Sequence, residues 1–230
     1  MATKIVTKNS STASAVPTAS DLVQGELAVN VADKRLFTED NAGAIVELGT
    51  NPTSLTVSGS LSTPTAGVSN VRFGANAGNS IASGGNYNTV VGDEAGTAIT
   101  TGDYHTTVGY AAGASVTTAT NNTVIGALAG DALTEGNYNV VVGVNALTAD
   151  TKGSYTTALG HGALAAQNFT SATDSYNTAV GHGAGAAVTT GVRNTLIGGL
   201  AGDALTDADY NTAIGYGALS TDTLGLRSTA

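Results

Sequence analysis

The chain has 230 residues, a net charge of −9 and 31 glycines, and only 5% of its residues are aromatic. It contains neither cysteine nor tryptophan, which excludes disulfides, thiolate metal sites and a bulky globular core. The negative charge disfavours nucleic acid as a partner, and no apolar stretch is long enough to predict membrane insertion.

The first fifty residues form a separate module, because they hold half of the eight basic residues in the chain. Residues 25–30 and 35–38 alternate as hairpin strands around a turn at 32–34, and a third strand is expected at 44–48. Residues 51–69 contain Pro52 and Pro64 among many Ser and Thr, which predicts a connector.

An internal repeat dominates the rest of the sequence. Glycines recur at intervals of 17 residues, with one interval of 18 and one of 21, over nine copies: Gly74, Gly92, Gly109, Gly126, Gly143, Gly160, Gly181, Gly198 and Gly215. The residue before each glycine is large and apolar, and we expect this column to be buried. Alanine stands three positions after every glycine, where nothing larger is expected to fit.

Each copy contains the parts of one solenoid coil. Most copies read Asn-Thr-x-Val/Ile before the glycine, which predicts a short strand. Copies end in Thr-x-Gly-Asn/Asp-Tyr, where Gly and Asn are expected to supply the positive φ of a tight turn, and a second short run completes the coil. The prediction is an all-β chain: a small hairpin or meander module at 1–50, then a parallel β-solenoid, or β-roll, of nine repeats over 70–220 and a C-terminal tail at 221–230. Because such thin coils bury little apolar area alone, we expect a homotrimer.

Two parts of the sequence resemble known families. Residues 17–30, Pro-Thr-Ala-Ser-Asp-Leu-Val-Gln-Gly-Glu-Leu-Ala-Val-Asn, with Asp33, Leu36, Phe37 and Asp40, resemble the N-terminal module that attaches phage tail fibres and related virion proteins to the particle. Residues 210–219, Tyr-Asn-Thr-Ala-Ile-Gly-Tyr-Gly-Ala-Leu, and residues 176–184 resemble the repeats of phage fibre shafts. They are also similar to the head domains of trimeric autotransporter adhesins, which are trimeric left-handed β-rolls.

The resemblance implies a structural virion fibre or spike, most simply a tail fibre used in host attachment, and not an enzyme. Residues 1–50 would dock on other virion proteins, and Leu27, Val29, Leu36 and Phe37 are the candidate docking residues. No secretory signal is recognised, so assembly in the host cytoplasm and residence in the virion are expected. The alternatives are a capsid-attached fibre, a tailspike depolymerase, a bacterial surface adhesin and an ice-binding solenoid.

Other candidate sites have plainer explanations. Acidic turn residues such as Asp93 and Glu94 suggest a solvated surface more than a glycosidase pair. His161 and His182 share one column, which otherwise has mixed composition, so neither a metal nor a cofactor is predicted. A threonine ladder runs through the repeats, but its partner column on the same strand face is Val or Ile, which differs from an ice-binding face.

The break in the period, between Gly160 and Gly181, is the candidate contact site for a host glycan or receptor. Its surplus residues Gln167, Asn168, Phe169 and Thr170 are expected to bulge as a loop. In one reading Phe169 is exposed and contacts a partner, and in the other it folds back over the adjoining coil.

Overall fold

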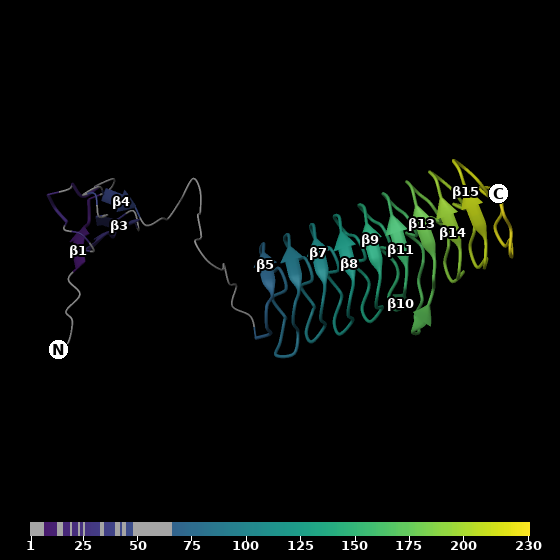
Figure 1. The fold of residues 1–230 in the computed structure, drawn as a ribbon, viewed down its shortest axis with the longest axis horizontal. Coiled ribbons are helices and arrows are strands. Elements are labelled where there is room, and N and C mark those ends of the chain that lie inside the picture. Colours follow the sequence, from purple (N-terminus) through teal and green to yellow (C-terminus); the bar gives the residue numbers. More distant parts are fainter. Residues whose placement is uncertain are drawn as a thin grey trace. The chain divides into compact units, whose positions relative to one another are not determined.

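The computed structural model describes residues 7–12, 16–18, 20–22, 24, 26–32, 35–39, 42, 45–47 and 66–230. The chain divides into two compact units, Met1–Ser60 and Leu61–Ala230 (Figure 1). All described elements are strands, and no helix that could cross a membrane occurs in the described ranges. The predicted all-β class is confirmed.

The first unit contains a four-stranded sheet with the order β1-β2-β3-β4. The predicted hairpin and third strand are present as antiparallel β2–β3 and β3–β4 pairs, although the tip of the hairpin turn lies outside the described residues. A further strand, β1, pairs in parallel with β2 and was not predicted from the sequence. The strands are β1 (Thr7–Ser10), β2 (Leu27–Asn30), β3 (Arg35–Glu39) and β4 (Ile45–Glu47).

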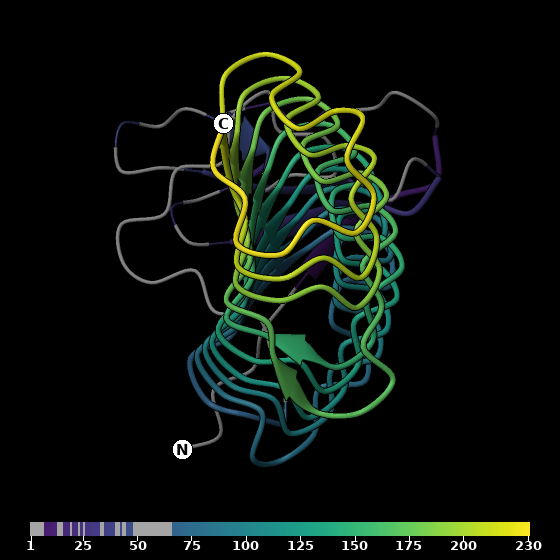
Figure 2. The same cartoon turned by 90° about the vertical axis from the view of Figure 1, so that its right-hand side faces the viewer.

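The second unit is the predicted parallel β-solenoid, in which each of nine coils contributes one strand to a nine-stranded parallel sheet (Figures 1 and 2). Every strand pairs with the strand of the next coil along the chain. Turns, and not the expected second short run, form the rest of most coils. The strands are β5 (Val71–Phe73), β6 (Thr89–Val91), β7 (Thr106–Val108), β8 (Thr123–Ile125), β9 (Val140–Val142), β11 (Thr157–Leu159), β13 (Thr178–Val180), β14 (Thr195–Ile197) and β15 (Thr212–Ile214).

The long coil, between Gly160 and Gly181, forms a second, two-stranded parallel sheet with the coil before it. Its strands β10 (Gly153–Ser154) and β12 (Thr173–Asp174) pair away from the main sheet (Figure 2). The connector at 51–69 lies largely outside the described residues. Residues 221–230 continue the stacking, because Thr206 N donates to Thr223 O and Ala230 N donates to Thr212 O.

The inward column of the main sheet is the middle residue of each strand. Val90, Val124 and Leu196 are fully buried. The residues just before the glycines were predicted to be buried, and this is wrong: Phe73 is 48% and Ile214 is 60% exposed. Alternation along a strand points neighbouring residues to opposite faces, so the column before the glycines faces outward together with the threonines.

The alanine column is buried as predicted, from Ala77 to Ala201. The repeat glycines have φ between 130° and 139°. A Cβ on Gly109 would also lie 2.7 Å from the backbone carbonyl carbon of Gly126 in the next coil. Backbone conformation and coil spacing therefore both require glycine.

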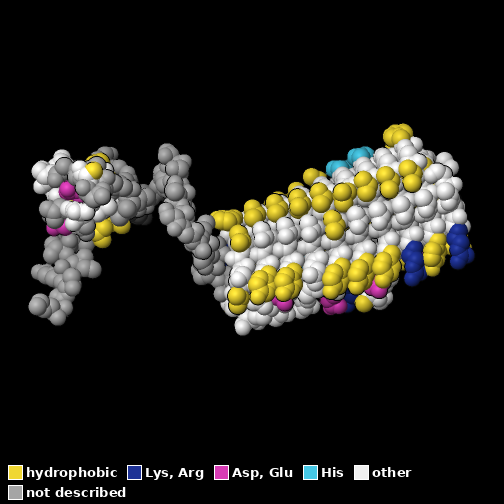
Figure 3. All heavy atoms as spheres, viewed as in Figure 1, with side chains coloured by type: hydrophobic (Ala, Val, Ile, Leu, Met, Phe, Trp, Pro, Cys, Tyr) yellow, Lys and Arg dark blue, Asp and Glu magenta, His cyan; other side chains and the backbone are white. Residues whose placement is uncertain are grey.

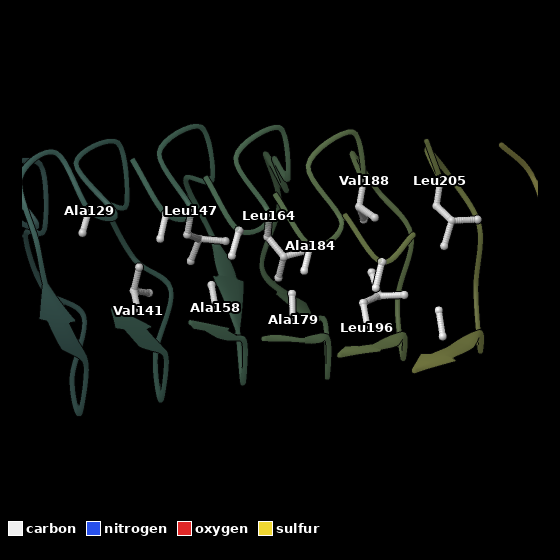
Figure 4. Packing of buried hydrophobic residues seen from close by; sticks show 14 of the residues in the cluster. Ala129, Val141, Leu147, Ala158, Leu164, Ala179, Ala184, Val188, Leu196 and Leu205 are labelled. Atoms are coloured by element: carbon white, nitrogen blue, oxygen red, sulfur yellow. The ribbon is translucent and has the colours of Figure 1, made fainter. Parts of the chain in front are cut away.

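Two further positions in each coil, four and seven residues after the repeat glycine, compete for the same space in the core. In most coils an apolar residue seven positions after the glycine fills the interior, as Ile99 and Leu205 do. A Cβ on Gly96, four positions after its repeat glycine, would lie 2.6 Å from Ile99 Cδ1. In three coils the arrangement is reversed, because Leu147, Leu164 and Leu219 replace that glycine. Leu147 and Leu164 are fully buried in the core (Figure 4), and the partly buried Leu219 packs against it. The residues seven positions after the repeat glycine in these coils, Asp150, Gln167 and Asp222, are then polar.

Buried asparagines tie most coils to the next coil along the chain. Asn139 Nδ2 donates to Gly153 O at 2.8 Å, and Asn139 Oδ1 accepts from Thr156 N at 2.8 Å. The same pattern recurs through Asn88, Asn122 and Asn194. Each amide thus satisfies backbone groups that no strand ladder reaches.

His105 takes the place of asparagine in one coil. Its Nε2 lies 2.7 Å from Ala119 O, and its Nδ1 accepts from Asn122 N at 3.4 Å. Both contacts require a neutral ring that carries its proton on Nε2. Burial lowers the pKa of His105 below its ordinary value, which matches this tautomer.

Candidate functional site

The outward face of the main sheet carries two continuous columns, which we call the outward stripe. One column begins each strand and is mostly threonine, and the other precedes the glycines. Figure 3 shows the second column as a row of yellow side chains along the solenoid. The stripe consists of Val71, Thr89, Thr106, Thr123, Val140, Thr157, Thr178, Thr195 and Thr212, with Phe73, Val91, Val108, Ile125, Val142, Leu159, Val180, Ile197 and Ile214. A parallel sheet normally has both faces covered, yet in one chain this face is exposed or half-exposed.

A second surface, the tyrosine ladder, runs beside the outward stripe (Figure 3). It consists of Tyr87, Tyr104, Tyr138, Tyr155, Tyr176 and Tyr210 with Arg193 and Arg227. Tyrosine rings of successive coils stack with centroids 5.0–5.3 Å apart. Both arginines lie over the ring of Tyr210, with Cζ 5.2 Å from its centroid. The ladder is an exposed, stacked aromatic and cationic edge.

The backbone under the ladder differs from the sequence prediction. Tyrosines such as Tyr138, with φ of 58°, adopt the positive φ that was expected of Gly and Asn. Gly136 is needed for space instead, because a Cβ there would lie 2.7 Å from Leu133 Cδ1 and still closer to the Gly153 carbonyl oxygen. The close approach of neighbouring coils therefore requires the glycine of this turn, and the tyrosines of the ladder carry the backbone strain of a positive φ.

The four predicted contact residues of the long coil lie partly on the surface and partly in the interior. Asn168 and Thr170 are exposed, as are Ser171 and Ala172, so a surface bulge is present. An exposed Phe169 is contradicted, because that ring is 6% exposed and follows the fold-back reading.

Gln167 is also buried, in the column that is apolar in most coils. Its Nε2 donates to Asp150 Oδ2 at 2.7 Å, and Asp150 Oδ1 accepts from Gly153 N and Phe169 N. Burial raises the pKa of Asp150, against the opposing effect of these hydrogen bonds. The inner half of the long coil is therefore a polar core cluster, and only the outer half is open to a partner.

The candidate docking residues lie on both faces of the first sheet. Phe37 is buried with Leu22 and Ala28, while Leu27, Val29 and Leu36 are half-buried. Phe37 therefore contributes to the core of this unit. The half-buried side chains are the ones that a partner could reach, and their docking role stays a prediction.

The remaining candidates are surface features. His161 and His182 stack with ring centroids 5.3 Å apart on the exposed side of the solenoid. Across the described ranges, no group of three or more His, Cys, Asp or Glu side chains is placed to hold a metal. Asp131 and Asp207 accept hydrogen bonds from Thr148 and Thr189 of neighbouring coils, so these acidic turns link coils.

Short segments of this chain are similar to phage long tail fiber proteins. A segment of 41 residues, 18% of this chain, is 51% identical to the long tail fiber protein Gp37 of Enterobacteria phage T2 and covers 3% of that protein. A segment of 42 residues is 52% identical to the Gp37 protein of Escherichia phage AR1 and covers 4% of it. No family model and no solved structure matches the chain. The two matches confirm the predicted resemblance to phage tail fibres.

Proposed function

We propose that this chain is a structural, non-enzymatic component of a bacteriophage tail fibre, with the solenoid as its shaft and residues 1–50 as its docking module. The similarity to two Gp37 long tail fibre proteins supports this role. The matched segments cover only 3–4% of those proteins, so the role as a whole is our proposal. Assembly in the host cytoplasm and host attachment belong to the same proposal.

The outward stripe is the observation that carries the proposed assembly. Three copies packed with their stripes toward a common axis would cover the bare sheet face of each chain, where Ile125 and Ile197 are exposed. The same packing would shield the stripe's apolar columns from unrelated sheets. A homotrimer follows from this arrangement.

Sedimentation equilibrium tests the assembly. We expect a mass three times the 22.5 kDa of one chain. Ile197→Asp places a charge in the outward stripe and should shift the equilibrium toward monomer, whereas the matched control Ser171→Asp, on the exposed bulge, should leave the trimer intact. A stable monomer with native β circular dichroism for the unaltered chain would refute the trimer.

Particle assembly tests the docking module, and host adsorption tests the bulge. Particles made with a chain lacking residues 1–50 should lack this protein, while the solenoid still folds. Deleting 167–170 would also remove buried Gln167 and Phe169, so the bulge is better tested with the exposed pair Asn168→Ala and Thr170→Ala. Unchanged adsorption of particles with this double variant would contradict a contact role.

A further inference from the structure

The tyrosine ladder has one gap. Between Tyr87 and Arg227, every coil of the described solenoid places Tyr or Arg at the ladder position except one, which has Asn121. In Figure 3 the lower row of yellow and blue side chains along the solenoid is interrupted by white ones. Tyr104 and Tyr138 bound the gap.

The backbone is continuous through the gap. Asn121 has φ of 61°, and Arg193, a ladder residue, has φ of 59°. Asn121 N donates to Asp103 O at 3.0 Å, and Tyr138 N donates to Thr120 O at 3.2 Å, which is the usual coil-to-coil pattern. The break is therefore due to the short Asn121 side chain in place of Tyr or Arg, and not to a distorted coil.

Asn121 adds neither an aromatic ring nor a cation between the two rings. Its Nδ2 donates to Thr120 Oγ1 at 3.0 Å in its own coil. Tyr104 stacks on Tyr87 and Tyr138 stacks on Tyr155, and no ring contact joins Tyr104 to Tyr138 across the gap. Each of the two bordering rings thus turns one unstacked face toward the gap.

The same ladder shows which group fits such a space. Arg193 lies between Tyr176 and Tyr210, with Cζ 5.8 and 5.2 Å from their centroids, and its Nη1 donates to Tyr210 Oη at 2.6 Å. Tyr104 and Tyr138 are separated by the same two coils of 17 residues as Tyr176 and Tyr210. The gap consequently spans the same number of coils as the Arg193 site, but no arginine of this chain occupies it.

We propose that this gap binds the guanidinium group of an arginine side chain presented by a partner protein. The planar cation stacks between the rings of Tyr104 and Tyr138 and donates to the Tyr138 hydroxyl, as Arg193 does at Tyr210. The negative ring faces and the chain charge of −9 complement the cation. A lysine ammonium lacks the flat shape that stacks on both rings. This site goes beyond the fibre role and does not depend on the trimer.

Nuclear magnetic resonance of the full chain with ring-labelled tyrosine tests the site, with N-acetyl-arginine amide as the probe. We expect saturable shifts at Tyr104 and Tyr138, with a dissociation constant in the millimolar range and at least about tenfold weaker binding of N-acetyl-lysine amide. Asn121→Arg supplies the guanidinium from the chain itself and should weaken probe binding at least about tenfold. Tyr138→Phe keeps the ring but removes the acceptor, and should weaken binding several-fold even if the arginine variant does not fold.

Three outcomes would overturn the proposal. The first is the absence of shifts at these two rings. The second is equal binding of the lysine amide, or stronger binding of methyl glucoside, which would indicate a general cation or sugar site. The third is undiminished binding to a folded Asn121→Arg chain, which would place the probe elsewhere.

Discussion

Replacing Asn139 by alanine is expected to destabilise the solenoid by about 2–6 kcal/mol per chain. The amide donates to Gly153 O and accepts from Thr156 N, both at 2.8 Å, and Asn139 is fully buried. Alanine would leave one buried carbonyl and one buried N–H without partners, and each unsatisfied group costs about 1–3 kcal/mol. Loss of the side-chain volume adds a smaller cavity contribution.

Urea unfolding, followed by circular dichroism at fixed chain concentration, measures this change. The matched control is Asn168→Ala, because Asn168 is exposed and accepts only a long 3.3 Å hydrogen bond from Thr151 Oγ1. The control should change the free energy of unfolding by less than about 0.5 kcal/mol. If Asn139→Ala cost no more than the control, the asparagine ladder would not be what satisfies these backbone groups.

Three other predictions follow from the core. Ala129→Leu should overpack one coil and lower the free energy of unfolding by about 1–3 kcal/mol per chain, and unchanged stability would place the alanine column outside. Because burial lowers the pKa of His105, the unfolded chain takes up the proton first as the pH falls, so stability should decrease below pH 6.5. His105→Asn should remove that part of the loss, measured as melting temperatures between pH 7 and pH 5. The contribution of Asp150 to the pH dependence of stability has the opposite sign, because its raised pKa means that the folded chain takes up the proton first. This group should therefore increase stability as the pH falls toward 3.8. An unchanged pH profile in Asp150→Asn would contradict this prediction.

The repeat period and the small-residue columns were predictable from the sequence because they reflect fixed backbone spacing. Alanine occupies a column that is buried between coils, and glycine is required where φ is positive and the next coil leaves no room for a Cβ. The inward face of the strand was not predictable in the same way. In a pair such as Val90-Val91 both residues are apolar, so alternation alone does not say which one faces the core.

The long coil shows a second limit. Polar Gln167 and Asp150 suggest a surface loop when each is considered alone, but both occupy a core column. The available signal was the paired exchange in which Leu147 and Leu164 replace glycine in the same two coils. Phe169 is buried because its segment packs over this polar cluster, a tertiary effect that no local pattern encodes. Strand β1 was missed for a related reason, since Thr7–Ser10 carries no apolar alternation.

Electron microscopy of purified phage particles carrying a gold label on this chain tests the central claim most directly. We expect label on thin fibres that project from the tail, with three labels on each fibre. Label confined to the capsid, or particles that contain no copy of the chain, would contradict its role as a tail-fibre component.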